Sequence, residues 1–192
     1  MQLLRDHQCA GAQVARRDAD DVERLVRANL AQGVFRFFIT DDNLARNHNW
    51  EAIFDRLIEM REQEGLELQF IIRIDTLCLR ISNFVEKAAR AGCKRVFIGL
   101  ENINPDNLLQ AKKKQNRVHE YRQMFLAWRA QRVSTYAGCI LGFPGDTPER
   151  IACDIRTVQR ELPLISWNFF PDAIAGLGRP SGAAQERGVD GP

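Results

Sequence analysis

Short β-rich apolar runs alternate with longer segments of helical period through the middle of this chain. The sequence predicts strands over Val34–Thr40, Leu68–Ile74, Arg95–Gly99 and Val133–Leu141. Strands that alternate with helices indicate parallel βαβ units, because two parallel strands need a crossover connection between them. The pattern fits an α/β fold, as either an open doubly wound sheet or a β/α barrel, and periodicity does not distinguish the two.

The segments between and after these strands carry apolar residues three and four positions apart, which predicts helices with one face against the sheet. The stripes are Val22, Leu25, Val26 and Leu30; Trp50, Ile53, Phe54 and Leu57; Phe84, Val85, Ala88 and Ala89; Tyr121, Met124, Phe125 and Trp128; and Ile151, Ile155 and Val158. Thr147-Pro148-Glu149 is a signal for the start of the last helix.

The two ends of the chain show neither period. We expect an atypical segment over residues 1–15, a folded unit over residues 16–170, and a disordered tail over residues 171–192, where Gly, Pro and Ala predominate.

Composition excludes several classes of function. The net charge is only +2 and the charges are interspersed, so we expect no nucleic-acid partner. The sequence has neither a membrane-spanning apolar run nor a secretory signal, which predicts a cytoplasmic protein. The five cysteines are odd in number and far apart, which argues against a disulfide framework and predicts no metal loop among them.

Other polar residues give weaker signals. The three histidines have no cysteine or carboxylate at metal-ligand spacing, so we expect no metal site from them. A set of basic residues is best interpreted as a solvated surface: Arg36, Lys112, Lys113, Lys114 and Arg117.

Candidate ligand-binding residues follow the predicted strands, because parallel β/α folds bind ligands at the carboxyl ends of their strands. Asp41 and Asp42 follow the first strand and can bind an ammonium or hydroxyl group, although either of them, or Asn43, can equally cap a turn. The second strand carries Arg73 and is followed by Asp75.

The third strand ends in Gly99 and Glu101. A glycine inside a strand suggests that another group approaches the backbone closely at Gly99. The Glu101 carboxylate either reaches into a barrel mouth or forms a salt bridge with Lys94, Arg95 or Arg73.

The fourth strand carries the most specific signal. Gly138, Gly142 and Gly145 remove side chains around Ile140, so backbone amides and carbonyls are expected to contact the edge of a flat ligand while Ile140 packs against it. Phe143-Pro144-Gly145-Asp146 is also a good turn sequence, so the signal depends on its place between a strand and a helix.

These strand ends, in this order, resemble the radical S-adenosylmethionine (SAM) superfamily, in particular the branch that usually carries a cobalamin-binding domain before its barrel. The likeness lies between Arg16 and Leu164, in the segments FFITDDNLARNHNWEAIFDRL, RIDTLC, AARAGCKRVFIGLENINPDNL and YAGCILGFPGDTPERI. The resemblance implies a partial (β/α) barrel and cleavage of SAM by a 4Fe–4S cluster to a 5′-deoxyadenosyl radical. Cobalamin is implied only for full-length relatives.

The resemblance also assigns roles to the candidate residues. The family's G-x-I-x-G pattern places Gly138, Ile140 and Gly142 against the adenine, and the GLEN segment places Glu101 near the methionine or ribose part of SAM. Asp41 and Asp42 are placed beside the amino group of SAM.

One family feature is missing. Members carry C-x-x-x-C-x-x-C after the first strand, and its three thiolates hold the cluster. This chain has only Cys9 in that region, so we expect it to bind no cluster and to be inactive. The alternatives are a non-catalytic barrel remnant or nucleoside-binding module, and a cluster-free β/α barrel enzyme that uses Glu101 or Asp41 as acid or base.

A frame disruption would explain both ends of the chain. Codons can be chosen for Met1–Ala15 that, read from their second base, encode C-S-F-C-A-I-I-N-V-Q-G-R-K-S, which resembles the family's C-x-x-C and the residues after it. A similar shift from Pro171 onward also gives family-like sequence. This hypothesis predicts frame disruptions in the DNA near both ends.

A barrel without its first strand would expose the edge of the strand near Val34, which predicts self-association.

Overall fold

A six-stranded parallel sheet forms the centre of the computed structural model, which describes residues 3–4, 17–41, 43–104, 107, 118–143, 145–163 and 166–171. The strands are β1 (Leu3–Leu4), β2 (Arg36–Ile39), β3 (Gln69–Ile74), β4 (Cys93–Glu101), β5 (Ser134–Leu141) and β6 (Ser166–Pro171). Each strand pairs in parallel with the next one in the chain. The four strands expected from the sequence are therefore confirmed, with ends that differ by up to two residues.

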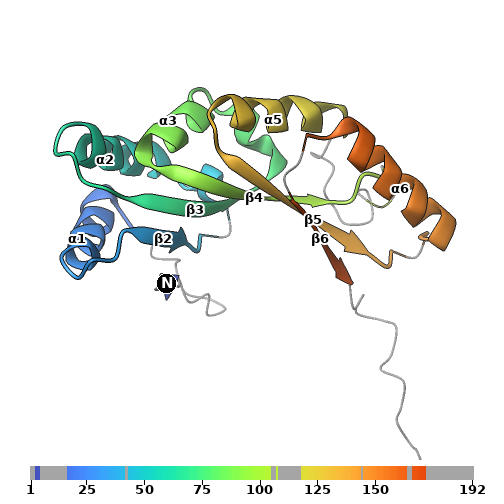
Figure 1. Ribbon diagram of the computed structural model, residues 1–192, viewed down its shortest axis with the longest axis horizontal. Coiled ribbons are helices and arrows are strands. Elements are labelled where there is room, and N and C mark those ends of the chain that lie inside the picture. The colour runs from blue at the N-terminus through green and yellow to red at the C-terminus, as the bar shows by residue number, and fades with distance from the viewer. Residues whose placement is uncertain are drawn as a thin grey trace, which may run out of the picture.

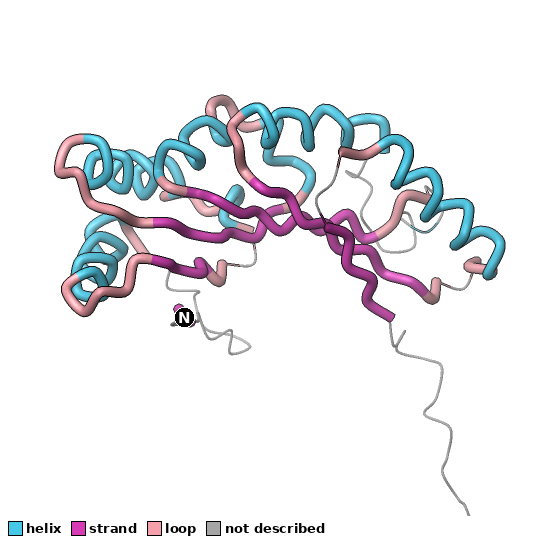
Figure 2. Tube along the Cα trace, viewed as in Figure 1, coloured by secondary structure: helices cyan, strands magenta, loops and turns pink. Residues whose placement is uncertain are grey.

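The strand order settles the choice between a doubly wound sheet and a barrel-type sheet. The spatial order β1-β2-β3-β4-β5-β6 never reverses, so every right-handed crossover places its helix on the same face. Figures 1 and 2 show all the labelled helices on one side of the curved sheet. The helices are α1 (Ala19–Leu30), α2 (Trp50–Glu62), α3 (Phe84–Ala91), α5 (Val118–Ala130) and α6 (Pro148–Glu161), and two 3-10 turns are η1 (Leu44–Arg46) and η2 (Thr76–Arg80). The fold is a partial (β/α) barrel.

Local sequence signals set the helix ends. Asp18 caps α1 by accepting a hydrogen bond from the N–H of Asp21 (2.8 Å), and Thr147 caps α6 by accepting from the N–H of Arg150 (3.3 Å). Gly92 ends α3 with a φ of 113°, and a Cβ there would lie 2.7 Å from the Leu68 carbonyl oxygen. Glycine is thus required for the chain to turn from α3 into β4.

The hydrophobic core lies between the sheet and its helices. Phe84 of α3 is fully buried, and its ring packs against the rings of Trp50, Phe54 and Trp128 at centroid distances of 5.0, 5.4 and 6.3 Å. These four aromatic side chains join α2, α3 and α5 and contribute much of the apolar burial on this side of the sheet.

The sheet has two different faces. We call the helix-covered side the outer face and the opposite side the inner face. Phe70, Ile72 and Ile74 of β3 are buried on the outer face, whereas the alternate residues Ile71 and Arg73 lie on the inner face, where Arg73 is exposed. Among the described residues, no helix covers the inner face.

Both chain ends differ in part from the expectation. Leu3 and Leu4 form β1 opposite Phe38 and Ile39, so these two residues of β2 are not an open edge as predicted. Pro171, which was assigned to the tail, ends β6 opposite Leu141. The sequence missed both strands because two residues give no period and β6 lies at the edge of the recognisable pattern. Residues 5–16 and 172–192 lie outside the described part, and self-association stays a prediction.

Candidate functional site

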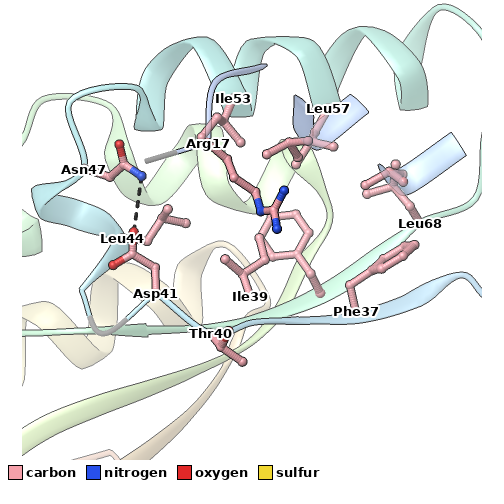
Figure 3. Close-up of a pocket in the computed structure, with 13 residues that line it drawn as sticks. Arg17, Phe37, Ile39, Thr40, Asp41, Leu44, Asn47, Ile53, Leu57 and Leu68 are labelled. Carbon is pink, nitrogen blue, oxygen red and sulfur yellow. Dashed lines mark hydrogen bonds between the residues drawn. The ribbon is translucent and has the colours of Figure 1, made fainter. Parts of the chain in front are cut away.

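Asp41 lies at the carboxyl end of β2, where it holds a turn. Its Oδ1 accepts a hydrogen bond from the N–H of Asn43 (3.0 Å), and its Oδ2 accepts one from Nδ2 of Asn47 (3.2 Å; Figure 3). These contacts are those of the turn-capping alternative. Asp42, the other predicted ligand at this position, lies outside the described residues.

An ion pair joins the ends of β2 and β3 beside Asp41. Arg46 of η1 donates to Oδ2 of Asp75 from Nε (3.0 Å) and Nη2 (2.6 Å), and the Leu77 N–H donates to Oδ1 (2.9 Å). The Asp75 side chain is 12% exposed and that of Arg46 is 56% exposed. Asp75 is among the residues predicted from the sequence, whereas Arg46 is not, because no local signal pairs two segments 29 residues apart.

Three of the predicted residues, Arg73, Gly99 and Gly138, lie near one another on the inner face. Arg73 lies in register with Phe97, and two residues further along β4 Gly99 lies in register with Gly138 of β5. The structure therefore places two glycines side by side near the carboxyl ends of the central strands. Gly99 is partly buried and Gly138 is buried.

The side chain of Glu101 lies close to Gly99. A register shift separates Gly99 from Glu101, and Glu101 has a left-handed φ of 66°. Its carboxylate folds back over Gly99, where an added Cβ would lie 3.1 Å from Glu101 Oε1. The predicted close approach at Gly99 is thus confirmed, and the approaching group is the carboxylate of Glu101 itself.

The turn after β5 corrects one expectation. Gly142 has a left-handed φ of 104°, but its amide is not open to a ligand as predicted. Asp146 Oδ2 accepts hydrogen bonds from the N–H groups of Gly142 (2.9 Å) and Phe143 (3.1 Å), and its Oδ1 accepts one from Asn107 Nδ2 (2.7 Å). A carboxylate placed four residues later satisfies the amides that the glycine pattern exposes.

Ile140 is also tied to the neighbouring strand end. Its carbonyl accepts a hydrogen bond from Nδ2 of Asn102 (3.2 Å), and Asn102 Oδ1 accepts from the N–H of Asn104 (2.7 Å). Asn102 is buried, so both polar ends of its side chain are used structurally. This bond joins the loop after β4 to β5, and the Asn107–Asp146 contact joins it to the turn after β5. Sequence spacing alone does not reveal either contact.

The described cysteines do not fit an iron–sulfur cluster. Cys78, Cys93 and Cys139 are buried, and burial raises the pKa of the Cys78 and Cys93 thiols to about 12, whereas cluster ligands are thiolates. Cys153 is exposed on α6. Within the described ranges, no three His, Cys, Asp or Glu residues gather in a way that could hold a metal ion. Cys9 lies outside those ranges.

A pocket lies on the outer face between α1, α2 and β2 (Figure 3). Ile39, Ile53 and Leu57 line it, and the guanidinium of Arg17 points into it. The cavity of about 60 Å³ has room for a few water molecules but is far smaller than the 300 Å³ or more of ordinary ligand pockets. Thr40 and Asp41 also line it, so the pocket reaches the carboxyl end of β2, and we interpret it as a packing gap between the helices and the sheet.

The described helices include none that is both long and apolar enough to cross a bilayer.

Among curated proteins, the chain is 27% identical over 149 residues to bacteriochlorophyllide d C-12(1)-methyltransferase of Chlorobaculum tepidum, covering 76% of this chain and 32% of that protein. The chain therefore spans about a third of the length of this relative.

Solved structures share the fold. The radical SAM methyltransferase TsrM from Kitasatospora setae, solved with tryptophan substrate and a SAM analogue, aligns with a TM-score of 0.68 at 19% identity, over 80% of this chain and 30% of that one. Coproporphyrinogen III oxidase (HemN) from Escherichia coli, a radical SAM enzyme, aligns with a TM-score of 0.55 at 16% identity, over 79% of this chain and 37% of that one.

The family itself is identified by a sequence model. The model of the radical SAM superfamily matches residues 11–157, which is more than half of the 192 residues. With the singly wound parallel sheet and the strand-end glycines in place, this match shows that the chain belongs to the radical SAM superfamily.

Proposed function

We propose that this chain forms the SAM-binding wall of a radical SAM barrel but does not assemble the 4Fe–4S cluster, so that it does not cleave SAM. Gly138 would contact the flat part of the cofactor, and Glu101, whose carboxylate lies over the neighbouring Gly99, would bind its ammonium or ribose hydroxyl groups. The observation that carries the proposal is the register of Gly99 with Gly138 beneath the Glu101 carboxylate.

The cysteines support the second half of the proposal. A radical SAM cluster needs three thiolates on one loop, and the three buried cysteines belong to η2, β4 and β5. Even with Cys9, the sequence offers one cysteine near the position where the family has three. When the family's cluster is bound, it supplies the electron that cleaves SAM.

We further propose methyl transfer as the reaction of a complete enzyme built on this barrel. Bacteriochlorophyllide d C-12(1)-methyltransferase and TsrM are both methyltransferases, and TsrM has also been solved with cobalamin and a 4Fe–4S cluster. We extend to this chain the expectation that a cobalamin-binding domain accompanies such a barrel. The coding DNA tests this directly, since an upstream cobalamin domain and cluster cysteines in another reading frame would identify a frame disruption.

Two measurements on the purified chain test the proposed function. Anaerobic reconstitution with iron and sulfide should give no cluster absorbance, while calorimetry should detect binding of S-adenosylhomocysteine, the demethylated product of SAM. Glu101→Gln should weaken this binding about tenfold, because it removes the charge partner of the ligand's ammonium group. Glu67→Gln is the matched control, since Glu67 is exposed and lies just before β3, at the end of the sheet opposite to Glu101.

The outcomes separate the two parts of the proposal. Incorporation of four irons per chain with SAM cleavage would contradict the claim that no cluster forms. A folded chain that binds no S-adenosylhomocysteine would reject the nucleoside-binding role and leave a barrel remnant. Activity that survives removal of iron and SAM would instead favour a cluster-free enzyme.

A further inference from the structure

Glu101 adopts a backbone conformation that is unusual for a residue with a side chain. Its φ is 66°, and the N–H of Asn102 donates across it to the carbonyl of Leu100 (2.8 Å). This is a γ-turn of the rare, strained form in which φ is positive. Among the other described non-glycine residues with a positive φ, Asn83 is of a type that tolerates it and Arg132 follows the end of α5, where it is common. Within the described strands, Glu101 alone carries this strain.

The strained turn sets the direction of the Glu101 side chain. The register shift between Gly99 and Glu101 leaves Leu100 as an extra residue on β4 relative to β5. Bulges and strained residues of this kind re-aim a side chain and are concentrated beside functional sites. Here the carboxylate is turned back along its own strand, with Oε1 3.1 Å from the position of a Cβ added at Gly99. The turn therefore keeps the carboxylate on the inner face.

Asn102 holds the turn from its carboxyl side. The residue is only 4% exposed, and its backbone N–H makes the hydrogen bond that closes the turn. Its Nδ2 donates to the carbonyl of Ile140 on β5 (3.2 Å), and its Oδ1 accepts from the N–H of Asn104 (2.7 Å). A buried amide that is bonded at both ends has one favoured orientation. Asn102 therefore ties the strained turn to the neighbouring strand.

Tyr121 supports the same turn from the helical layer. It is buried in α5, and its hydroxyl donates to the carbonyls of Leu100 (3.4 Å) and Asn102 (3.5 Å), the residues on either side of Glu101. Both distances are long for a hydroxyl donor, so each contact is weaker than those of the Asn102 side chain. A phenylalanine would fill the same apolar space, so the hydroxyl serves polar contacts rather than packing.

We propose that Asn102 and Tyr121 are positioning residues that hold Glu101 in its strained turn and so keep its carboxylate aimed at a ligand on the inner face. The strain destabilises the fold, and the hydrogen bonds from β5 and α5 offset it. A carboxylate that is fixed in advance loses less conformational entropy on binding than a mobile one. The ligand-binding part of this inference rests on the proposed function, whereas the strain at Glu101 does not.

Two substitutions of Glu101 measure the strain in the absence of any ligand. Glu101→Gly and Glu101→Ala both remove the carboxylate, but glycine adopts a positive φ freely whereas alanine keeps the strain. The urea midpoint of Glu101→Gly should therefore be higher than that of Glu101→Ala. A midpoint for Glu101→Gly that is equal to or below that of Glu101→Ala would contradict the strain.

Calorimetry with S-adenosylhomocysteine on the full chain tests the positioning role. Tyr121→Phe should weaken binding about threefold and Asn102→Ala about tenfold. In the Glu101→Ala background neither substitution should weaken binding further, because the carboxylate that they position is absent. Thr157→Val is the matched control, since it removes a hydroxyl that donates to a backbone carbonyl within α6 (Cys153, 3.0 Å), and it should keep the affinity of the unmodified chain.

The results separate this inference from the proposed function. A folded, unmodified chain that binds no S-adenosylhomocysteine would contradict the proposed function, and the two urea midpoints would still decide the strain. Unchanged affinity in Tyr121→Phe and Asn102→Ala, or equal losses with and without the Glu101 side chain, would reject the positioning role. Far-ultraviolet circular dichroism checks that each variant is folded. If Asn102→Ala does not fold, Tyr121→Phe decides, because it removes a single hydroxyl group.

Discussion

The outer and inner faces of the sheet are built from alternate residues of the same strands, yet they differ in what they contain. The outer face packs against an apolar core in which Phe84, Phe54 and Trp128 of the covering helices are fully buried. The inner face carries arginines, glycines and a carboxylate, with partly buried aromatic side chains between them. The comparison indicates that packing on the outer face supplies much of the free energy of folding, whereas the inner face carries the residues proposed to bind a ligand.

The largest expected effect tests this division directly. Phe84→Ala should lower the free energy of unfolding by about 3–5 kcal/mol, because it leaves a cavity among three aromatic rings. Phe97→Ala, on the inner face of β4, should cost no more than about half as much, since its side chain is only partly buried. Urea unfolding of both variants gives the comparison, and equal losses would contradict it.

A second variant tests what stabilises the turn after β5. Asp146→Ala should cost about 1–3 kcal/mol, because two backbone amides and the side chain of Asn107 lose their acceptor. Hydrogen exchange at Gly142 and Phe143 should become faster. Unchanged protection at both amides would show that Asp146 does not fix this turn.

The smallest effect concerns a carboxyl group in the helical layer. Burial, and then the nearby negative charge of Asp146, raises the pKa of Asp154 on α6. A raised carboxyl pKa means that the folded chain binds this proton more tightly than the unfolded chain does. The free energy of unfolding therefore decreases as the pH rises from the pKa of the unfolded chain through the higher pKa of the folded chain.

Asp154→Asn should therefore stabilise the chain more at pH 7 than at pH 4. The effect on the free energy of unfolding should be smaller than those of Phe84→Ala and Asp146→Ala, because the carboxyl group is largely solvated. Urea midpoints at the two pH values measure this. A variant whose advantage is greater at pH 4 would contradict the assigned direction. The same variant serves as a control for Asp146→Ala, since it should leave hydrogen exchange at Gly142 unchanged.

Much of the outer layer could be predicted from the sequence. The stripe of Tyr121, Met124, Phe125 and Trp128 predicted a buried helix face, and all four side chains are buried in α5. Such predictions succeed because helical period and apolar burial are both local properties of the chain. The glycine pattern after β5 likewise identified the correct strand end, although Asp146 occupies the amides that it seemed to leave open.

Contacts between residues far apart in the chain could not be predicted in the same way. Arg46 and Asp75 are paired across 29 residues, and Asn102 bonds to Ile140 across 38. The position of Arg95 on the inner face depends on a one-residue register shift, which reverses the side-chain alternation of a strand. These features depend on strand register and loop packing, on which sequence spacing gives no information.

The sequence by itself determined the βαβ alternation, the buried helix stripes, the glycines at the strand ends and the resemblance to the radical SAM superfamily. Only the tertiary structure decided that the sheet is singly wound with all its described helices on one face, that Glu101 folds over Gly99, and that Arg95 lies in register with Ile71 on the other face. The physical reason is the range of the interactions. Burial and helix propensity act between near neighbours, whereas strand register is fixed by hydrogen bonds between segments far apart in the chain.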